Sequence, residues 1–252
     1  MDYLLLSNLS IIASGLIIGS FINVVAYRIP QNLPIVFSRS MCPSCNEQIP
    51  LYRNIPIITY IIQRGRTNCC NTSMSIQYPV IECLTSIIFL LGFNNYTNDE
   101  YLLFLWISSI LIIISIIDYK TLKIPLILSV YIFFAEILFL IQNINNYIIM
   151  LWGLLFGISY LGVTFIITSL IYQKQTLGYG DLILIGLLGA WLGPINILIC
   201  IFISAIIGVI IWLIKYFKNE SNNKLPLGTY LSVSAIIIKI LNLDFISYIN
   251  NY

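Results

Sequence analysis

The feature that most constrains this chain is a series of long runs without a charged residue. A helix needs about 20 apolar residues to cross the hydrocarbon core of a bilayer, and several of these runs approach or exceed that length. Only 9% of the residues are charged, against roughly a quarter in soluble globular domains. The pattern therefore predicts an all-α, polytopic integral membrane protein. The runs cover residues 3–27, 83–97, 101–117, 124–135, 147–173 and 182–214.

About eight transmembrane helices are expected from these runs. The first, near 4–27, should be retained, because it is too long for a signal peptide and lacks a small-residue cleavage site. A single helix over 182–214 would be about 50 Å long, well beyond a hydrocarbon core of about 30 Å. The "LGP" at 192–194 should divide this run into two crossings, the first short enough to be tilted, broken or partly buried. The other helices are expected near 79–94, 101–118, 125–141, 147–172 and 227–243.

Positive charges gather in alternate connections between these helices. Five arginines lie in 28–77 and lysines lie in every second later connection, whereas 94–100 and 142–146 contain neither residue type. By the positive-inside rule, the basic connections face the cytoplasm and both termini face outward. We therefore expect a multi-pass protein of the cytoplasmic (inner) membrane, in contact with membrane lipids and without a nucleic-acid partner.

This topology divides the chain into three parts. Residues 1–27 form the first transmembrane helix. Residues 28–77 contain five prolines, five arginines and four of the six cysteines, a composition that predicts a small cytoplasmic insertion after that helix. Residues 78–252 form the membrane-embedded core.

Two aspartates fall at the cytoplasmic ends of predicted helices. Asp118 ends one helix, and Asp181 begins another directly after Gly178 and Gly180. An ionisable group at membrane depth costs at least about 2.5–3.5 kcal/mol, so it is usually retained for a function. Two carboxylates that face each other share one proton, and such a pair can act as general acid and general base on a water molecule. Because glycines let a peptide strand approach closely, the pattern indicates aspartic-protease chemistry at the cytoplasmic face.

Other interpretations of these aspartates stay open. An aspartate at a helix start is a good cap, and Asp118 near Lys120 could be an interfacial anchor. A proton- or cation-coupled membrane transporter could use the same carboxylates as a relay or an ion site. Against a transporter, no inverted repeat is visible, and both aspartates lie near one face rather than at the midplane.

Four further residues in helical runs are expected to be structural. Glu82 and Glu136 are ionisable, and a hydrogen-bonded structural role is the simplest expectation for each. Cys83 and Cys200 are expected to act as small apolar packing residues.

An ordered series of short motifs runs along nearly the whole chain. The segments are "GSFINVVAYRIP" at 19–30, "CPSC" at 42–45, "RNIPI" at 53–57, "RGR" at 64–66, "YPVIE" at 78–82, Asp118 with "IP" at 124–125, "GYGD" at 178–181 and "LPLGTYL" at 225–231. In this order they resemble the motifs of the type IV prepilin peptidases, which are membrane aspartic peptidases of the GxGD class. A lone GxGD would be a weak signal, but the ordered series is highly specific.

The resemblance implies removal of a short basic leader from prepilin or pseudopilin precursors, after a glycine and before a hydrophobic helix. Asp118 and Asp181 correspond to the family's catalytic pair, with Gly178 and Gly180 as supporting residues. The pair activates water directly, so the peptidase needs no cofactor. The predicted topology agrees, because such a substrate inserts with its basic leader in the cytoplasm.

Many members of this family also methylate the new N-terminus with S-adenosylmethionine, an activity associated with the N-terminal region and its cysteines. Two CxxC pairs are expected there, and four thiolates at that spacing form a tetrahedral zinc site. Here "CPSC" is intact, but Thr67 stands where the second pair would begin. The resemblance therefore implies a structural zinc held by Cys42, Cys45, Cys69 and Cys70, with adjacent ligands that require a bent backbone. The alternative is a set of reduced cytoplasmic thiols.

Two departures from the family pattern lie near the aspartates. Ile183 stands where a lysine is common, and Leu126 follows "IP" where an aspartate is usual. Neither removes a catalytic carboxylate, so both bear on substrate range or pH optimum. A scaffold without activity, or a methyltransferase alone, is a further alternative, although the altered cysteine set argues against the latter.

Overall fold

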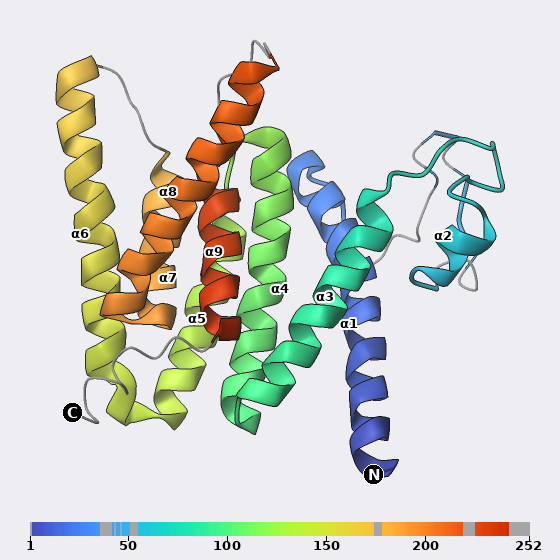
Figure 1. The fold of residues 1–252 in the computed structure, drawn as a ribbon, viewed down its shortest axis with the longest axis horizontal. Coiled ribbons are helices and arrows are strands. Elements are labelled where there is room, and N and C mark those ends of the chain that lie inside the picture. Colours follow the sequence, from blue (N-terminus) through green and yellow to red (C-terminus); the bar gives the residue numbers. More distant parts are fainter. Residues whose placement is uncertain are drawn as a thin grey trace. The chain divides into compact units, whose positions relative to one another are not determined.

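A computed structural model of the chain describes residues 2–35, 42, 44–45, 47–50, 55–173, 178–218 and 225–241 (Figure 1). The chain separates into two compact units, 1–101 and 102–252. The regular elements of the described residues are helices, and these residues form no β-strand, which confirms the all-α prediction. Arg39, Arg53, Lys174, Lys224 and residues 242–243 of the last expected helix lie outside the described residues.

In the N-terminal unit, α1 (Asp2–Arg28) packs closely against α3 (Gln77–Asn95) (Figure 1). A Cβ atom at Gly15 would lie 2.5 Å from the Cα of Ser86, and one at Gly19 would lie 2.7 Å from the Cα of Glu82. The two backbones therefore touch along a small-residue stripe. The hydroxyl of Ser86 adds an interhelical hydrogen bond of 3.1 Å to the carbonyl of Ile12. Small residues serve in this way between membrane helices, where apolar surfaces gain little from leaving lipid.

The segment between these helices contains the short helices η1 (Ile29–Gln31) and α2 (Ile58–Ile62). Glu82 ties this segment to α3, because its buried Oε2 accepts a 2.7 Å hydrogen bond from the backbone N–H of Ile57. Ile57 has a φ of 58°, which is rare for a β-branched residue. The hydrogen-bonded structural role expected for Glu82 is confirmed.

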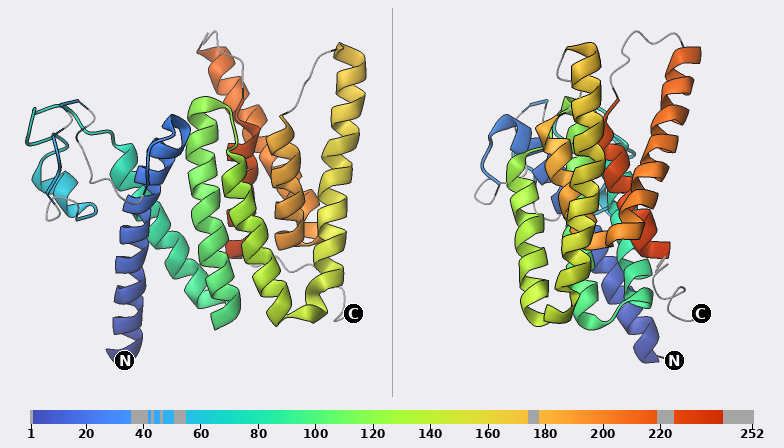
Figure 2. Two further views of the ribbon diagram at one scale, coloured as in Figure 1. Left: turned by 180° about the vertical axis from the view of Figure 1, so that it is seen from behind. Right: turned by 90° about the vertical axis from the view of Figure 1, so that its left-hand side faces the viewer.

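The C-terminal unit contains most of α4 and five further α-helices (Figure 2). The predicted break at "LGP" is confirmed, since one helix ends at Leu192, Gly193 has a φ of 84° and the next helix begins at Pro194. The elements are α4 (Asn98–Thr121), α5 (Leu126–Gln142), η3 (Ile144–Asn146), α6 (Tyr147–Tyr172), α7 (Tyr179–Leu192), α8 (Pro194–Phe217) and α9 (Leu227–Leu241).

Among the described helices, five are long and apolar enough to cross a membrane, namely α1, α3, α4, α6 and α8. The shorter apolar helices are α5, α7 and α9. In α7, every residue from Leu184 to Leu192 is buried, whereas only 11% of the apolar window of α6 is buried. A short helix enclosed by protein need not match the bilayer thickness, because its ends are covered by neighbouring helices. The first half of the divided run is thus a short buried helix, as its length indicated.

Glycines bring α6 and α7 into backbone contact. A Cβ atom at Gly153 would overlap the carbonyl oxygen of Gly189, and one at Gly189 would overlap the carbonyl oxygen of Gly153. One turn further along α6, a Cβ atom at Gly157 would lie 2.6 Å from the carbonyl oxygen of Ile185. The fit of the buried helix therefore depends on residues without side chains.

Replacing Gly189 with valine is expected to destabilise the protein by about 1–3 kcal/mol, because the added side chain meets the backbone of Gly153. Thermal unfolding of the purified protein in detergent measures this effect. Gly162→Ala is the matched control in α6, since a Cβ atom there meets nothing within 4 Å. This control should unfold at or slightly above the wild-type midpoint, because alanine favours helix over glycine. Equal midpoints for the two variants would contradict the backbone contact.

Candidate active site

Three helix ends lie together at one end of the C-terminal unit (Figures 1 and 2). They are the C-terminal end of α4 and the N-terminal ends of α7 and α9, and α8 extends past them on the same side. Asp118 lies in the last turn of α4, Asp181 in the first turn of α7 and Thr229 in the first turn of α9. Residues more than 100 positions apart in the chain are thus neighbours.

The Asp118 side chain is buried and caps the start of α9. Its Oδ2 atom accepts hydrogen bonds from the backbone N–H of Thr229 at 2.8 Å and from the Thr229 hydroxyl at 3.1 Å. The first N–H groups of a helix lack partners within the helix, and they carry a partial positive charge. Asp118 therefore supplies the partner that the first turn of α9 lacks.

Asp181 is half-buried at the third position of α7, three residues after Gly178. The Asp181 amide donates a 3.1 Å hydrogen bond to the carbonyl of Gly178. The Asp181 carboxylate thus stands in the first turn of α7, where the helix dipole favours negative charge. It also lies close enough to Asp118 for their charges to interact.

Ile124 fills the space between the starts of α7 and α9. A Cβ atom at Gly180 would lie 3.0 Å from the Cβ of Ile124, and one at Gly228 would lie 2.7 Å from its Cδ1. The Cβ atom at Gly228 would also lie 3.2 Å from Oδ2 of Asp118. The absence of a side chain at these glycines lets both helix starts approach the end of α4.

Two carboxylates that interact in one partly buried site do not both ionise easily, so the pair favours a state that shares one proton. An ionised and a protonated carboxyl group side by side can remove a proton from water and deliver another to a substrate oxygen or nitrogen. The residues around Asp118 and Asp181 are therefore suited to acid–base hydrolysis.

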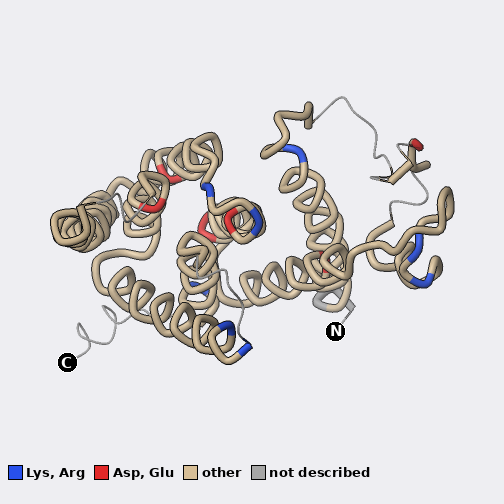
Figure 3. The backbone as a smooth tube through the Cα atoms, turned by 90° about the horizontal axis from the view of Figure 1, so that it is seen from above, with Lys and Arg blue, Asp and Glu red and all other residues tan. Residues whose placement is uncertain are grey.

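Several of the basic residues of the C-terminal unit lie near the ends of α4 and α8 (Figure 3). Lys120 lies in the last turn of α4 and Lys215 in the last turn of α8, Lys123 is the second residue after α4, and Lys218 follows α8 directly. Asp99 lies at the opposite end of α4. Both aspartates of the candidate site are thus on the lysine-rich side of the unit.

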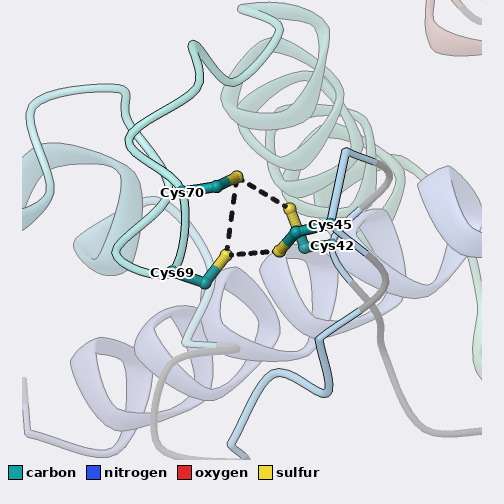
Figure 4. A group of neighbouring side chains, drawn as sticks. All are labelled: Cys42, Cys45, Cys69 and Cys70. Atoms are coloured by element: carbon teal, nitrogen blue, oxygen red, sulfur yellow. Dashed lines mark hydrogen bonds between the residues drawn. The ribbon is translucent and has the colours of Figure 1, made fainter.

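The N-terminal unit contains a separate cluster formed by Cys42, Cys45, Cys69 and Cys70 (Figure 4). All four sulfur atoms lie within 4.8 Å of one another, and three of the pairs are 3.3, 3.6 and 3.8 Å apart. Four sulfurs about 2.3 Å from a tetrahedral zinc ion are about 3.8 Å from one another. The spacing therefore suits a zinc ion, and the bend required by adjacent cysteines is present, with Asn71 at a φ of 55°.

Thr67 stands beside this cluster rather than in it. Its hydroxyl lies 3.3 Å from the Cys70 sulfur and 2.9 Å from the Thr72 hydroxyl. Hydrogen bonds from the Thr67 and Thr72 hydroxyls and from the Thr72 amide lower the pKa of the Cys70 thiol to about 6. Cys70 is therefore a thiolate at neutral pH, the form that binds metals.

A polar hollow of about 590 Å³ lies next to the cluster in the same segment. Two arginines and three residues with side-chain amides are among those that line it, a composition suited to a group with negative charge or several oxygens. Its lining residues are Gln63, Arg64, Arg66, Thr67, Asn68 and Asn71.

Sequence reasoning assigned no role to Ile124, Gly228 or Thr229, although all three lie in motifs that it identified. Those motifs, "IP" and "LPLGTYL", were the available signal, but neither indicated which side chain contacts Asp118. The buried residue Glu136 differs from expectation, because no described residue donates a hydrogen bond to its Oε1.

Of the two cysteines outside the cluster, one agrees with its predicted packing role and the other does not. Cys200 is buried with its sulfur 3.6 Å from the carbonyl of Leu231, as expected for a packing residue. The packing role predicted for Cys83 is wrong, because this residue points outward from α3 and is exposed in the described structure.

Comparisons with known proteins identify both halves of the chain. Residues 13–96 match the bacterial peptidase A24 N-terminal domain, and residues 105–213 match the type IV leader peptidase family. The prepilin leader peptidase/N-methyltransferase of Pectobacterium carotovorum subsp. carotovorum is 30% identical, over 90% of this chain and 91% of that protein. Proteins with the same description from Neisseria gonorrhoeae and Klebsiella pneumoniae are 31% and 34% identical, over 89% and 71% of this chain and 87% and 82% of their own lengths. No solved structure gave a significant match.

Proposed function

Because the chain belongs to the type IV leader peptidase family, we propose that Asp118 and Asp181 are the catalytic pair with which it removes the leader of prepilin-like precursors. The protein is a membrane-embedded prepilin peptidase. The observation that supports the catalytic pair is that these two carboxylates, from α4 and α7, lie close enough for their charges to interact in one partly buried site.

Hydrolysis requires only the two carboxyl groups and water. The ionised carboxylate removes a proton from water while the water oxygen attacks the scissile carbonyl, and the protonated carboxyl group donates its proton to the carbonyl oxygen. As the resulting gem-diol collapses, the first carboxyl group protonates the departing nitrogen and the second recovers a proton from a hydroxyl group. No covalent intermediate forms. Gly178 and Gly180 support this site by leaving room at the start of α7.

The positive charges suggest which side of the membrane holds the site. Lys120 lies in the same last turn of α4 as Asp118, Lys215 lies in the last turn of α8, and basic connections face the cytoplasm. We therefore propose that the site opens toward the cytoplasm at the inner membrane. A precursor inserted with its basic leader in the cytoplasm would present its scissile bond at this depth.

We also propose that residues 28–77 form a cytoplasmic insertion between the first transmembrane helix (1–27) and the core (78–252). Several relatives carry N-methyltransferase in their names, so methylation of the new N-terminus is proposed for this chain. S-adenosylmethionine would supply the methyl group. The polar hollow lined by Arg64 and Arg66 offers donors for an anionic group of such a molecule.

A structural zinc ion bound by the four clustered cysteines is part of this proposal. The four sulfurs have the spacing of a tetrahedral site, and the Thr67 hydroxyl orients one ligand without entering the cluster. Such an ion would link the "CPSC" turn to the turn at 69–70 and stabilise the insertion.

Asp118→Asn and Asp181→Asn are each expected to reduce cleavage at least about 1,000-fold, because neither amide can exchange a proton in this cycle. The assay uses purified protein in detergent with a prepilin-like peptide, and mass spectrometry identifies the products. Asp99→Asn is the matched control, since it removes a carboxylate at the far end of α4 and should retain activity. Cleavage by either active-site variant would refute the catalytic pair.

Cys42→Ser and Cys69→Ser are expected to lower bound zinc from about one ion per chain to near zero, because three-thiolate sites bind structural zinc more weakly. Elemental analysis of the purified protein measures the ion. Cys83→Ser and Cys200→Ser should leave the zinc content unchanged, since neither residue belongs to the cluster. Wild-type protein that binds no zinc after purification and reconstitution would support reduced thiols instead.

A further inference from the structure

The two carboxylates of the candidate site differ in the hydrogen bonds that they accept from the first turn of α9. Asp118 accepts hydrogen bonds from the backbone N–H and from the hydroxyl of Thr229 at 2.8 and 3.1 Å, whereas no such pair of donors faces the Asp181 carboxylate among the described residues. Hydrogen bonds donated to a carboxylate favour its ionised form, and more donors favour it further. When one proton is shared by the pair, these contacts place it on Asp181.

The Thr229 hydroxyl differs from the backbone donors, because it has a second partner. It lies 3.0 Å from the carbonyl oxygen of Ser115 and 3.1 Å from Oδ2 of Asp118. A hydroxyl group has one proton and two acceptor lone pairs, so it can donate to only one of these oxygens at a time. The Ser115 carbonyl can only accept, whereas Asp118 can accept when ionised or donate when protonated.

The two arrangements match the two protonation states of Asp118. With Asp118 ionised, the Thr229 hydroxyl donates to the carboxylate. With Asp118 protonated, the hydroxyl turns to the Ser115 carbonyl and accepts the carboxyl proton in a hydrogen bond. The hydroxyl therefore remains bonded in both states, which a backbone N–H cannot do.

We propose that Thr229 is a positioning residue that holds Asp118 as the ionised member of the pair and reorients when Asp118 takes up a proton. Asp118 is then the base toward water, and Asp181 carries the proton donated to the substrate carbonyl. In the second half of the reaction, Asp118 passes the proton from water to the departing nitrogen, and the Thr229 hydroxyl turns back. This inference rests on the proposed function and deepens it.

The other titratable groups near Asp118 belong to α4 itself and to the neighbouring helices α7 and α9. Asp181 of α7 and Tyr230 of α9 interact electrostatically with Asp118, and Tyr119 interacts with Tyr230. The Tyr230 hydroxyl is buried and has no hydrogen-bond partner among the described residues. Substitution of Thr229 leaves these groups in place, so a change in pH dependence reports on the hydroxyl.

The test compares two pairs of proteins, and the members of each pair differ by one hydroxyl group. The first pair is the wild type and Thr229→Val, and the second pair is Thr229→Ser and Thr229→Ala. Loss of the hydroxyl should lower kcat by about tenfold or more and move the acidic limb of the kcat profile to higher pH by about one unit. The sign follows because Asp118 without this donor keeps its proton to higher pH, so the ionised base appears only at higher pH. KM should stay within about twofold, since the hydroxyl contacts no substrate in this proposal.

The serine variant should restore most of the activity and the wild-type profile. Thr164→Val serves as control, because it removes a hydroxyl that bonds only within α6, at 2.9 Å to the Leu161 carbonyl. Its kcat and pH profile should match the wild type. If Thr229→Val does not fold, the serine and alanine variants still isolate the hydroxyl.

Three results would overturn the proposal: wild-type kcat in the hydroxyl-free variants, a lower kcat with an unchanged pH profile, or hydroxyl-free variants that both fail to fold. The last two would make Thr229 a structural residue only. Failure of the proposed function looks different, since wild-type protein would not cleave the peptide, or Asp118→Asn would still cleave it.

Discussion

The contact between the Asp118 carboxylate and the first turn of α9 is the interaction on which the candidate site depends. It joins the end of α4 to the start of α9, and it satisfies the backbone N–H of Thr229, which has no partner within its own helix. The same contact fixes the position of the Asp118 carboxylate. An aspartate at a helix end can therefore cap another helix and still be part of the candidate site.

Close approach of backbones makes this arrangement possible within a membrane. Apolar surfaces gain little from leaving lipid, so helices associate through tight packing and hydrogen bonds. Gly153 and Gly189 bring α6 against α7, and Gly180 and Gly228 let two helix starts reach Ile124. The short helices α7 and α9 lie largely buried while the long helices α6 and α8 are mostly exposed, and the candidate site is built at the starts of these two short helices.

The cysteine cluster shows how an altered motif can keep its geometry. Thr67 occupies the position where the motif begins, yet two adjacent cysteines bring their sulfurs to the "CPSC" turn at distances suited to zinc. The left-handed conformation of Asn71 supplies the bend, and the Thr67 hydroxyl contacts a sulfur instead of providing one. The conformation of the turn that carries the cysteines therefore indicates a metal site more directly than the spacing of the cysteines along the chain.

The sequence by itself determined the helices, the break at 192–194, the lysine-rich connections and the position of the two aspartates at helix ends. It could do so because length, hydropathy and charge act locally along the chain. It also indicated that the first half of 182–214 was too short for an ordinary crossing. Only the tertiary structure decided that Thr229 contacts Asp118 and that Ile124 separates Gly180 from Gly228. It likewise decided that Cys83 faces outward. These contacts join residues far apart in the chain, and they depend on helix rotation and close packing, which no local pattern encodes.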